Sequence, residues 1–164
     1  VLKIEGRARG AEYVKTVVEC YKEAIDAWHR GEWNEEAIEQ KIAAWDAQLM
    51  RVFNRGFWDG YYQGARLGEW SEVYGNKATK SKKYIGKVTN YFSNIGVAEI
   101  LIETGSISVG DNVIIIGPST GVVEVTVEEI RVDLKSTESA VKGEYCSIAV
   151  PEKLRRSDKL YLFQ

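Results

Sequence analysis

Basic side chains carry the clearest binding chemistry in this sequence. Five lysines follow one another with no acid between them: Lys77, Lys80, Lys82, Lys83 and Lys87. A second basic group contains Arg155 and Arg156, while Tyr84, Tyr91 and Phe92 lie beside the first. Lysines neutralise phosphates and aromatic rings stack on bases, so the pattern predicts an RNA-binding ridge. A solvated linker is the alternative interpretation of the same lysines.

The overall composition limits this prediction. The formal net charge is -2, so the chain has no global basic field, and any nucleic-acid binding must come from a local patch. Hydrophobic residues make up 45% of the 164 residues, which is enough for a buried core. Because the sequence contains no signal peptide and no apolar run long enough to cross a bilayer, we expect a cytoplasmic protein.

Nucleophilic and metal chemistry find little support. His29 is the only histidine, and its spacing from Cys20 puts the two side chains about half a turn out of phase on a helix. Ser71 and Ser119 lack a glycine elbow and a histidine partner. Cys20 and Cys146 are expected to be buried thiols in a reducing compartment. We therefore expect no catalytic set, no metal and no cofactor in this chain.

Two helices are predicted to precede the lysines. Apolar side chains recur at three- and four-residue steps between Ala11 and Arg30, which predicts a helix with one buried face. That face contains Val14, Val17, Val18, Tyr21, Ile25 and Trp28. Gly31 ends this helix, and Asn34 caps a second one. The buried stripe of the second helix contains Ile38, Ile42, Trp45, Leu49 and Val52. The short connection predicts an antiparallel hairpin.

The rest of the chain is predicted to form a short initial strand, an aromatic-rich segment and a β-domain. Val1 to Arg7 alternates apolar and charged residues, as a strand does, and its partners would lie in a larger protein. The run from Phe53 to Tyr74 contains Trp58 and Tyr61, which are candidate aromatic surface residues. Strands are predicted at 84–88, 96–102, 113–116, 121–127 and 146–150. The predicted fold class is α+β, an N-terminal helical hairpin followed by a small closed antiparallel β-barrel.

Two resemblances to known families add to this interpretation. Gly86-Lys-Val88, the turn ending in Val109-Gly-Asp111 and Ala140-Val-Lys-Gly143 resemble the second-domain barrel of translation elongation factors, although Glu144 stands where that family has aspartate. Leu2-Lys-Ile-Glu-Gly-Arg7 with the helix that follows is similar to the U32 peptidases, which are often called collagenase-like. Arg55-Gly-Phe-Trp-Asp-Gly-Tyr-Tyr-Gln-Gly64 also resembles a U32 segment, with Trp58-Asp59 in place of two threonines.

The U32 resemblance implies a division of the chain. Residues 1–75 would end the main domain, 76–83 would be a basic connector, and 84–164 would form a C-terminal barrel. Lys3, Glu5 and Arg7 would project from the end of a barrel strand and contact a ligand held by the upstream domain. Ordinary ion pairing is the alternative for these three residues.

The resemblance also implies a function. We expect a non-catalytic accessory domain that helps an upstream U32 catalytic domain to engage RNA, such as tRNA, and the parent would be a U32 peptidase or a tRNA-modification protein. One alternative is a module that recruits protein substrate to a collagenase-like protease. Another is a purely structural module that forms a homodimer or an interdomain surface.

Overall fold

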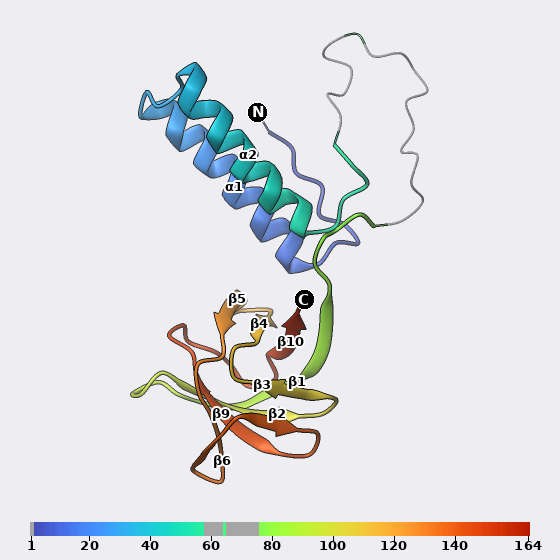
Figure 1. Ribbon diagram of the computed structural model, residues 1–164, viewed down its shortest axis with the longest axis vertical. Coiled ribbons are helices and arrows are strands. Elements are labelled where there is room, and N and C mark those ends of the chain that lie inside the picture. Colours follow the sequence, from blue (N-terminus) through green and yellow to red (C-terminus); the bar gives the residue numbers. More distant parts are fainter. Residues whose placement is uncertain (1, 58–63, 65–75) are drawn as a thin grey trace. The chain divides into compact units, whose positions relative to one another are not determined.

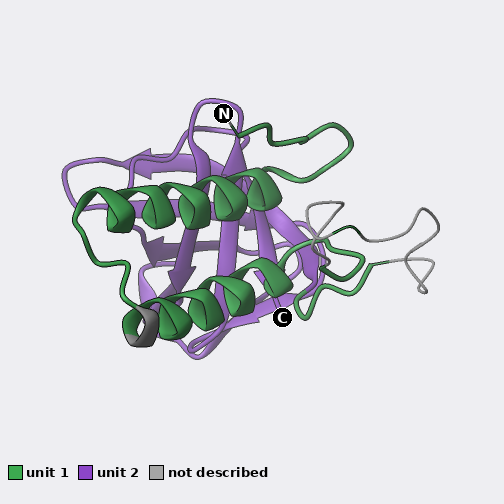
Figure 2. Ribbon diagram, turned by 90° about the horizontal axis from the view of Figure 1, so that it is seen from above, with its two compact units in different colours: residues 1–80 green, residues 81–164 purple. Residues whose placement is uncertain are grey.

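The computed structural model describes residues 2–57, 64 and 76–164. It divides into two compact units, Val1–Lys80 and Ser81–Gln164, which are described separately below. Figure 2 colours the two units green and purple. The predicted aromatic candidates Trp58 and Tyr61 lie outside the described residues.

The first unit is built on two helices joined by a short turn (Figure 1). Helix α1 spans Ala11–His29 and helix α2 spans Glu35–Arg51. Gly31 adopts a left-handed φ of +72° directly after α1, a conformation that favours glycine. The Asn34 side chain caps α2 by accepting a hydrogen bond of 2.9 Å from the backbone N–H of Ala37. The predicted pair of helices and both of its end signals are confirmed.

The predicted buried face of α1 is largely wrong. Only Val17 of the six predicted residues is buried, whereas Val14, Val18, Tyr21, Ile25 and Trp28 are exposed. The side of α1 that is buried carries Val17, Cys20 and Ala27. In α2, Trp45 is buried and Ile42 is exposed, and Val52 is buried just after the helix. One neighbouring helix covers only a narrow strip, so part of a wide apolar stripe remains in contact with solvent.

The predicted N-terminal strand is not formed by residues 2–7, the part of it that the structure describes. Leu2–Gly6 forms no strand among the described residues, and Arg7 and Ala8 form a turn. A strand needs a neighbour to satisfy its backbone N–H and C=O groups, and no described strand pairs with this segment. Neither described helix is apolar enough over a sufficient length to cross a bilayer.

The second unit consists of short antiparallel strands (Figure 1). Eight strands form one sheet in the order β5-β4-β10-β1-β2-β9-β6-β7, and β3 pairs with β8 in a separate ladder. The bounds are β1 Lys82–Phe92, β2 Val97–Ile102, β3 Ser106–Ser108, β4 Asn112–Gly117, β5 Gly121–Thr126, β6 Ile130–Val132, β7 Lys135–Thr137, β8 Ser139–Val141, β9 Tyr145–Ala149 and β10 Lys159–Phe163.

Branched side chains from these strands build the core. Along β2, every second residue is buried, as expected when one face of a strand is packed and the other is not. The fully buried core includes Ile85, Val88, Ile100, Ile102, Ile107, Val113, Ile115, Ile130, Ile148 and Leu160. Isoleucine and valine suit such a surface because their branched side chains pack well against neighbouring strands.

The prediction of a closed barrel is wrong. In the described part of the chain, β5 pairs only with β4, and β7 pairs only with β6, so no ladder joins the two ends of the eight-stranded sheet. Closure requires the edge strands to meet in register over several residues. Here the β7 edge offers only Lys135–Thr137, which follows a tight turn at Asp133 and Leu134 with left-handed φ angles. The antiparallel sheet itself is confirmed.

A close approach of two strands and a buried carboxylate constrain the backbone of the sheet unit. A Cβ on Gly86 would lie 2.0 Å from the carbonyl oxygen of Leu101, so β1 and β2 approach each other more closely there than a side chain permits. Buried Asp158 accepts hydrogen bonds from Thr120 Oγ1 and from the backbone N–H of Arg155, at 2.5 and 2.8 Å. These bonds hold the turn that leads into β10.

Candidate functional site

Strand pairing brings basic and aromatic side chains together on β1 and β10. In the register of these two strands, Tyr84 lies opposite Tyr161, and Lys87 lies opposite Lys159. The two tyrosine rings are 5.6 Å apart between centroids and meet at 67°. The Lys82 ammonium lies 5.2 Å from the centroid of the Tyr161 ring, within the range of a cation–π contact. We call these residues, Lys82, Tyr84, Lys87, Lys159 and Tyr161, the lysine–tyrosine surface.

Glu103 sets the electrostatics of this surface. Its carboxylate lies 2.7 Å from the Lys87 ammonium and also accepts a hydrogen bond from the Tyr84 hydroxyl. The hydrogen bond from Lys87, followed by the one from Tyr84, lowers the pKa of Glu103 below its ordinary value. The hydrogen bond to Glu103 raises the pKa of Tyr84 to about 12. At neutral pH, Tyr84 is therefore a neutral donor, and Lys87 is a cation with an anionic neighbour.

The other basic candidates are placed in different parts of the structure. Lys83 follows Lys82 in β1 and is exposed. Arg155 and Arg156 are exposed in the turn before β10 that Asp158 holds. Lys77 and Lys80 belong to the helical unit. The structure therefore brings Lys82 and Lys87 together with Lys159 and two tyrosines, and it does not gather all seven predicted cations at one place in either unit.

Lys3, Glu5 and Arg7 form no assembled site among the described residues. All three are exposed, and the Glu5 carboxylate accepts hydrogen bonds from the Arg7 backbone N–H, Nε and Nη2 at 2.8, 3.0 and 3.2 Å. The side-chain hydrogen bond from Arg7 is the main cause that lowers the pKa of Glu5. An exposed local pair of this kind contributes little to stability.

The thiols and the histidine do not form a nucleophilic site. Burial raises the pKa of Cys146 to about 12, and burial followed by nearby Glu23 raises the pKa of Cys20. Both thiols are buried and therefore remain protonated at neutral pH. His29 is exposed at the end of α1. Within the described residues, no group of three His, Cys, Asp or Glu side chains is placed to hold a metal ion.

Two residues of the lysine–tyrosine surface, and the carboxylate that pairs with it, were not singled out from the sequence as site residues. Glu103, Lys159 and Tyr161 became relevant only when β1, β2 and β10 were paired. The alternation in Lys159-Leu-Tyr-Leu-Phe163 was a usable signal for β10, because apolar and polar side chains alternate in a half-buried strand. No local signal links Glu103 to Lys87.

The sheet unit also has an apolar concavity of about 440 Å³. It lies between the β1–β2 hairpin, which contributes Phe92 and Ile95, and the β6–β7 hairpin, which contributes Leu134. Ile95 and Leu134 are 70% and 91% exposed. Leu134 adopts a left-handed φ of +65°, which is uncommon for a residue with a bulky side chain. Large apolar side chains held in water in this way are typical of a surface that contacts another molecule.

Comparisons with known proteins give consistent family relationships. Residues 1–72 match peptidase family U32. The chain is 58% identical over 163 residues to a Porphyromonas gingivalis protein named collagenase, covering 99% of this chain and 38% of that protein. It is 31% identical over 130 residues to a Bacillus subtilis protein named tRNA hydroxylation protein P1, covering 79% of this chain and 29% of that protein. The chain thus spans about two fifths of the length of the collagenase that it matches.

Two solved structures resemble the chain weakly. The C-terminal domain of a Geobacillus thermoleovorans protein described as a U32 peptidase covers 48% of this chain, with 89% of that domain matched, at 19% identity and a TM-score of 0.45. A bacterial selenocysteine-specific elongation factor covers 49% of this chain, with 14% of that protein matched, at 22% identity and a TM-score of 0.40. A TM-score of this size does not establish a shared fold with the translation factor.

Proposed function

Because the chain belongs to peptidase family U32, we propose that it is a non-catalytic accessory module that helps a U32 catalytic domain to engage RNA. The observation that carries this proposal is the lysine–tyrosine surface, on which Lys82 and Tyr84 both contact Tyr161. The name of one relative, a tRNA hydroxylation protein, makes tRNA the first RNA to test.

The chemistry of the surface fits single-stranded or looped RNA. Lysine ammonium groups neutralise phosphates, and the release of counterions supplies most of the affinity of such contacts. Tyrosine rings provide faces on which unpaired bases stack, a contribution of about 1–3 kcal/mol per base. Lys83, Arg155 and Arg156 extend the positive charge in the same unit.

To help a U32 catalytic domain, the module must dock on it, and the exposed apolar face of α1 supports such docking. Val18, Ile25 and Trp28 are 43%, 44% and 63% exposed on one side of the helix. The chain covers 38% of the collagenase relative, and we expect the partner of this face to lie in a part of the protein corresponding to the unmatched remainder. Lys3, Glu5 and Arg7 lie in the same unit, and they would then be available to a ligand of that partner.

A second candidate function is the recruitment of protein substrate to a collagenase-like protease. The apolar concavity beside Phe92, Ile95 and Leu134 favours it, as does the printed name of the 58% identical relative. Binding there would depend on apolar burial and would change little with salt. A homodimer formed through the α1 face is the structural alternative.

Fluorescence anisotropy with labelled tRNA separates these functions. We expect the full chain to bind tRNA at low salt, with an affinity that falls steeply as salt rises. The variant Lys82→Gln/Lys83→Gln should bind about tenfold or more weakly. The matched variant Lys22→Gln/Lys135→Gln, which loses the same charge elsewhere, should bind like the wild type. Absence of tRNA binding at low salt, or equal losses in both variants, would refute the RNA function. Salt-insensitive binding of a gelatin peptide, lost in Leu134→Ser, would support substrate recruitment instead.

A further inference from the structure

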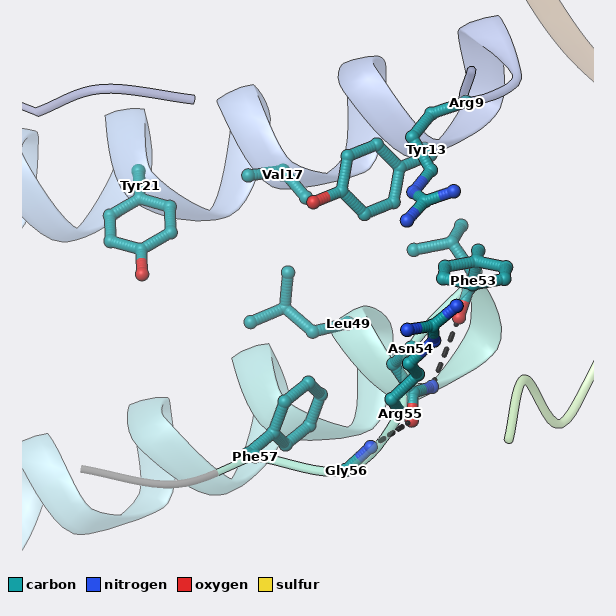
Figure 3. Close-up of a pocket in the computed structure, with 11 residues that line it drawn as sticks. Arg9, Tyr13, Val17, Tyr21, Leu49, Phe53, Asn54, Arg55, Gly56 and Phe57 are labelled. Carbon is teal, nitrogen blue, oxygen red and sulfur yellow. Dashed lines mark hydrogen bonds between the residues drawn. The ribbon is translucent and has the colours of Figure 1, made fainter. Parts of the chain in front are cut away.

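The helical unit contains a pocket that the RNA function does not use. It has a volume of about 360 Å³ and lies between the start of α1 and the segment that follows α2. Figure 3 shows Tyr13 and Arg9 on the α1 side, with Phe53, Arg55 and Phe57 on the other. Its size is within the range of about 300–1,000 Å³ that is typical of sites for small molecules.

Cationic groups gather around one ring in this pocket. The Arg9 guanidinium carbon lies 3.8 Å from the centroid of the Phe53 ring, and that of Arg55 lies 5.9 Å from the same centroid. The Lys77 ammonium is 3.5 Å from the position that a Cβ on Gly56 would take, so a third cation lies beside the pocket wall. No aspartate or glutamate is among the described residues that line the pocket.

The backbone that carries these groups is held by hydrogen bonds. The buried Asn54 side chain donates to the carbonyl oxygens of Val52 and Met50 at 3.0 and 3.3 Å, and it accepts from the Gly56 N–H at 3.2 Å. The backbone carbonyl oxygen of Asn54 accepts a hydrogen bond of 2.8 Å from the backbone N–H of Lys77. Figure 3 marks the hydrogen bond between Asn54 and Gly56. The backbone that carries Phe53, Arg55 and Lys77 is therefore held in place, which lowers the cost of ordering this wall of the pocket around a ligand.

We propose that this pocket binds a small organic anion whose carboxylate or phosphate group is held by Arg9 and Arg55. Guanidinium groups offer paired N–H donors that match the oxygens of carboxylates and phosphates. Arg9, Arg55 and Lys77 place positive charge on this side of the pocket, which favours an anionic ligand. Tyr13 and Phe57 also line the pocket and provide aromatic walls for an apolar or ring-shaped body. The proposal does not depend on RNA binding, because the lysine–tyrosine surface belongs to the other unit.

The test is a titration of the full chain with phenyl phosphate and with benzoate, followed by ¹H–¹⁵N NMR at the amides of Asn54 and Gly56. We expect saturable shifts, with dissociation constants in the millimolar range or tighter. Benzyl alcohol, which has the ring without the charge, should cause no saturable shift. Arg9→Gln and Arg55→Gln should each weaken binding about tenfold or more, as expected for the loss of a charge-assisted contact.

Arg30→Gln is the matched control. It removes one guanidinium just beyond the opposite end of α1, about 28 Å from the start of that helix, and should leave binding unchanged. The proposal is wrong if neither probe gives saturable shifts, or if Arg30→Gln weakens binding as much as Arg55→Gln. Equal affinity for inorganic phosphate and phenyl phosphate would also contradict it, because the aromatic walls would then contribute nothing.

A final arm separates a small anion from a phosphate of RNA. If Arg55→Gln weakens the binding of phenyl phosphate but not of tRNA, the pocket is a separate small-molecule site, as proposed. If tRNA displaces phenyl phosphate and Arg55→Gln weakens tRNA binding as strongly as Lys82→Gln/Lys83→Gln does, the pocket belongs to the RNA interface and the small-anion proposal fails.

Discussion

Replacing Glu103 by glutamine should strengthen RNA binding. In the structure, the Glu103 carboxylate lies 2.7 Å from the Lys87 ammonium and accepts a hydrogen bond from Tyr84. An RNA phosphate that approaches Lys87 must compete with this carboxylate. Glutamine has almost the same shape but no charge, so Lys87 becomes available to phosphate while the local geometry is largely kept.

The size of the effect follows from counterion release. Each additional phosphate contact changes the slope of log K against log salt by about −0.7 for single-stranded nucleic acid. One new contact at Lys87 should therefore steepen the slope by about that amount and raise the affinity at low salt roughly threefold to tenfold. Protein stability should change by no more than about 1 kcal/mol, because the lost pair is solvent-accessible, with side chains 43% and 33% exposed.

Fluorescence anisotropy across a salt series measures both quantities. Glu129→Gln is the matched control, because Glu129 pairs with Arg131 at 2.9 Å elsewhere in the sheet unit. A spectrophotometric titration tests whether the loss of the Glu103 charge changes this surface. In Glu103→Gln, the pKa of Tyr84 should fall from about 12 toward its ordinary value of 10.0. If Glu103→Gln and Glu129→Gln raise the affinity equally, only net charge matters, and the assignment of Lys87 to the RNA interface is refuted.

Three further predictions test other parts of the structure. Gly86→Ala should destabilise the sheet unit by about 1–3 kcal/mol in urea unfolding, because the new Cβ would lie 2.0 Å from the Leu101 carbonyl oxygen; an unchanged midpoint would contradict that contact. Burial raises the pKa of Cys146 from 9.0 to about 12, so its contribution to stability is present below pH 9 and is lost as the pH rises toward 12. In urea unfolding at a series of pH values, the stability of Cys146→Ala should not show the decline that this thiol causes. Ile25→Glu should abolish co-elution of the chain with a separately supplied U32 catalytic domain. If the wild type instead self-associates with rising concentration, and Ile25→Glu does not, the α1 face forms a homodimer.

The features that the sequence predicted well depend on neighbouring residues. Gly31 and Asn34 act within one turn of the chain, so the end of α1 and the start of α2 could be identified without any knowledge of tertiary contacts. The strands around Val97–Ile102 and Asn112–Gly117 were also predictable, because their apolar side chains and flanking glycines are local signals.

The features that the sequence predicted poorly depend on distant partners. The periodicity of α1 identified an apolar stripe correctly, but whether Ile25 is buried depends on what packs against it, and among the described residues α2 is the one helix paired with α1. β6, β7 and β8 have three residues each, which is too short for a periodic pattern. The contact between Lys87 and Glu103 exists only because β1 pairs with β2, so the lysine run alone gave no indication of an acidic neighbour.

Ultraviolet cross-linking of tRNA to the full chain, read out by mass spectrometry, tests the central proposal most directly. We expect nucleotide adducts on peptides that contain Tyr84 and Tyr161, and their loss when Lys82 and Lys83 are both replaced by glutamine. Adducts confined to other peptides, or none at concentrations where anisotropy reports saturation, would contradict it.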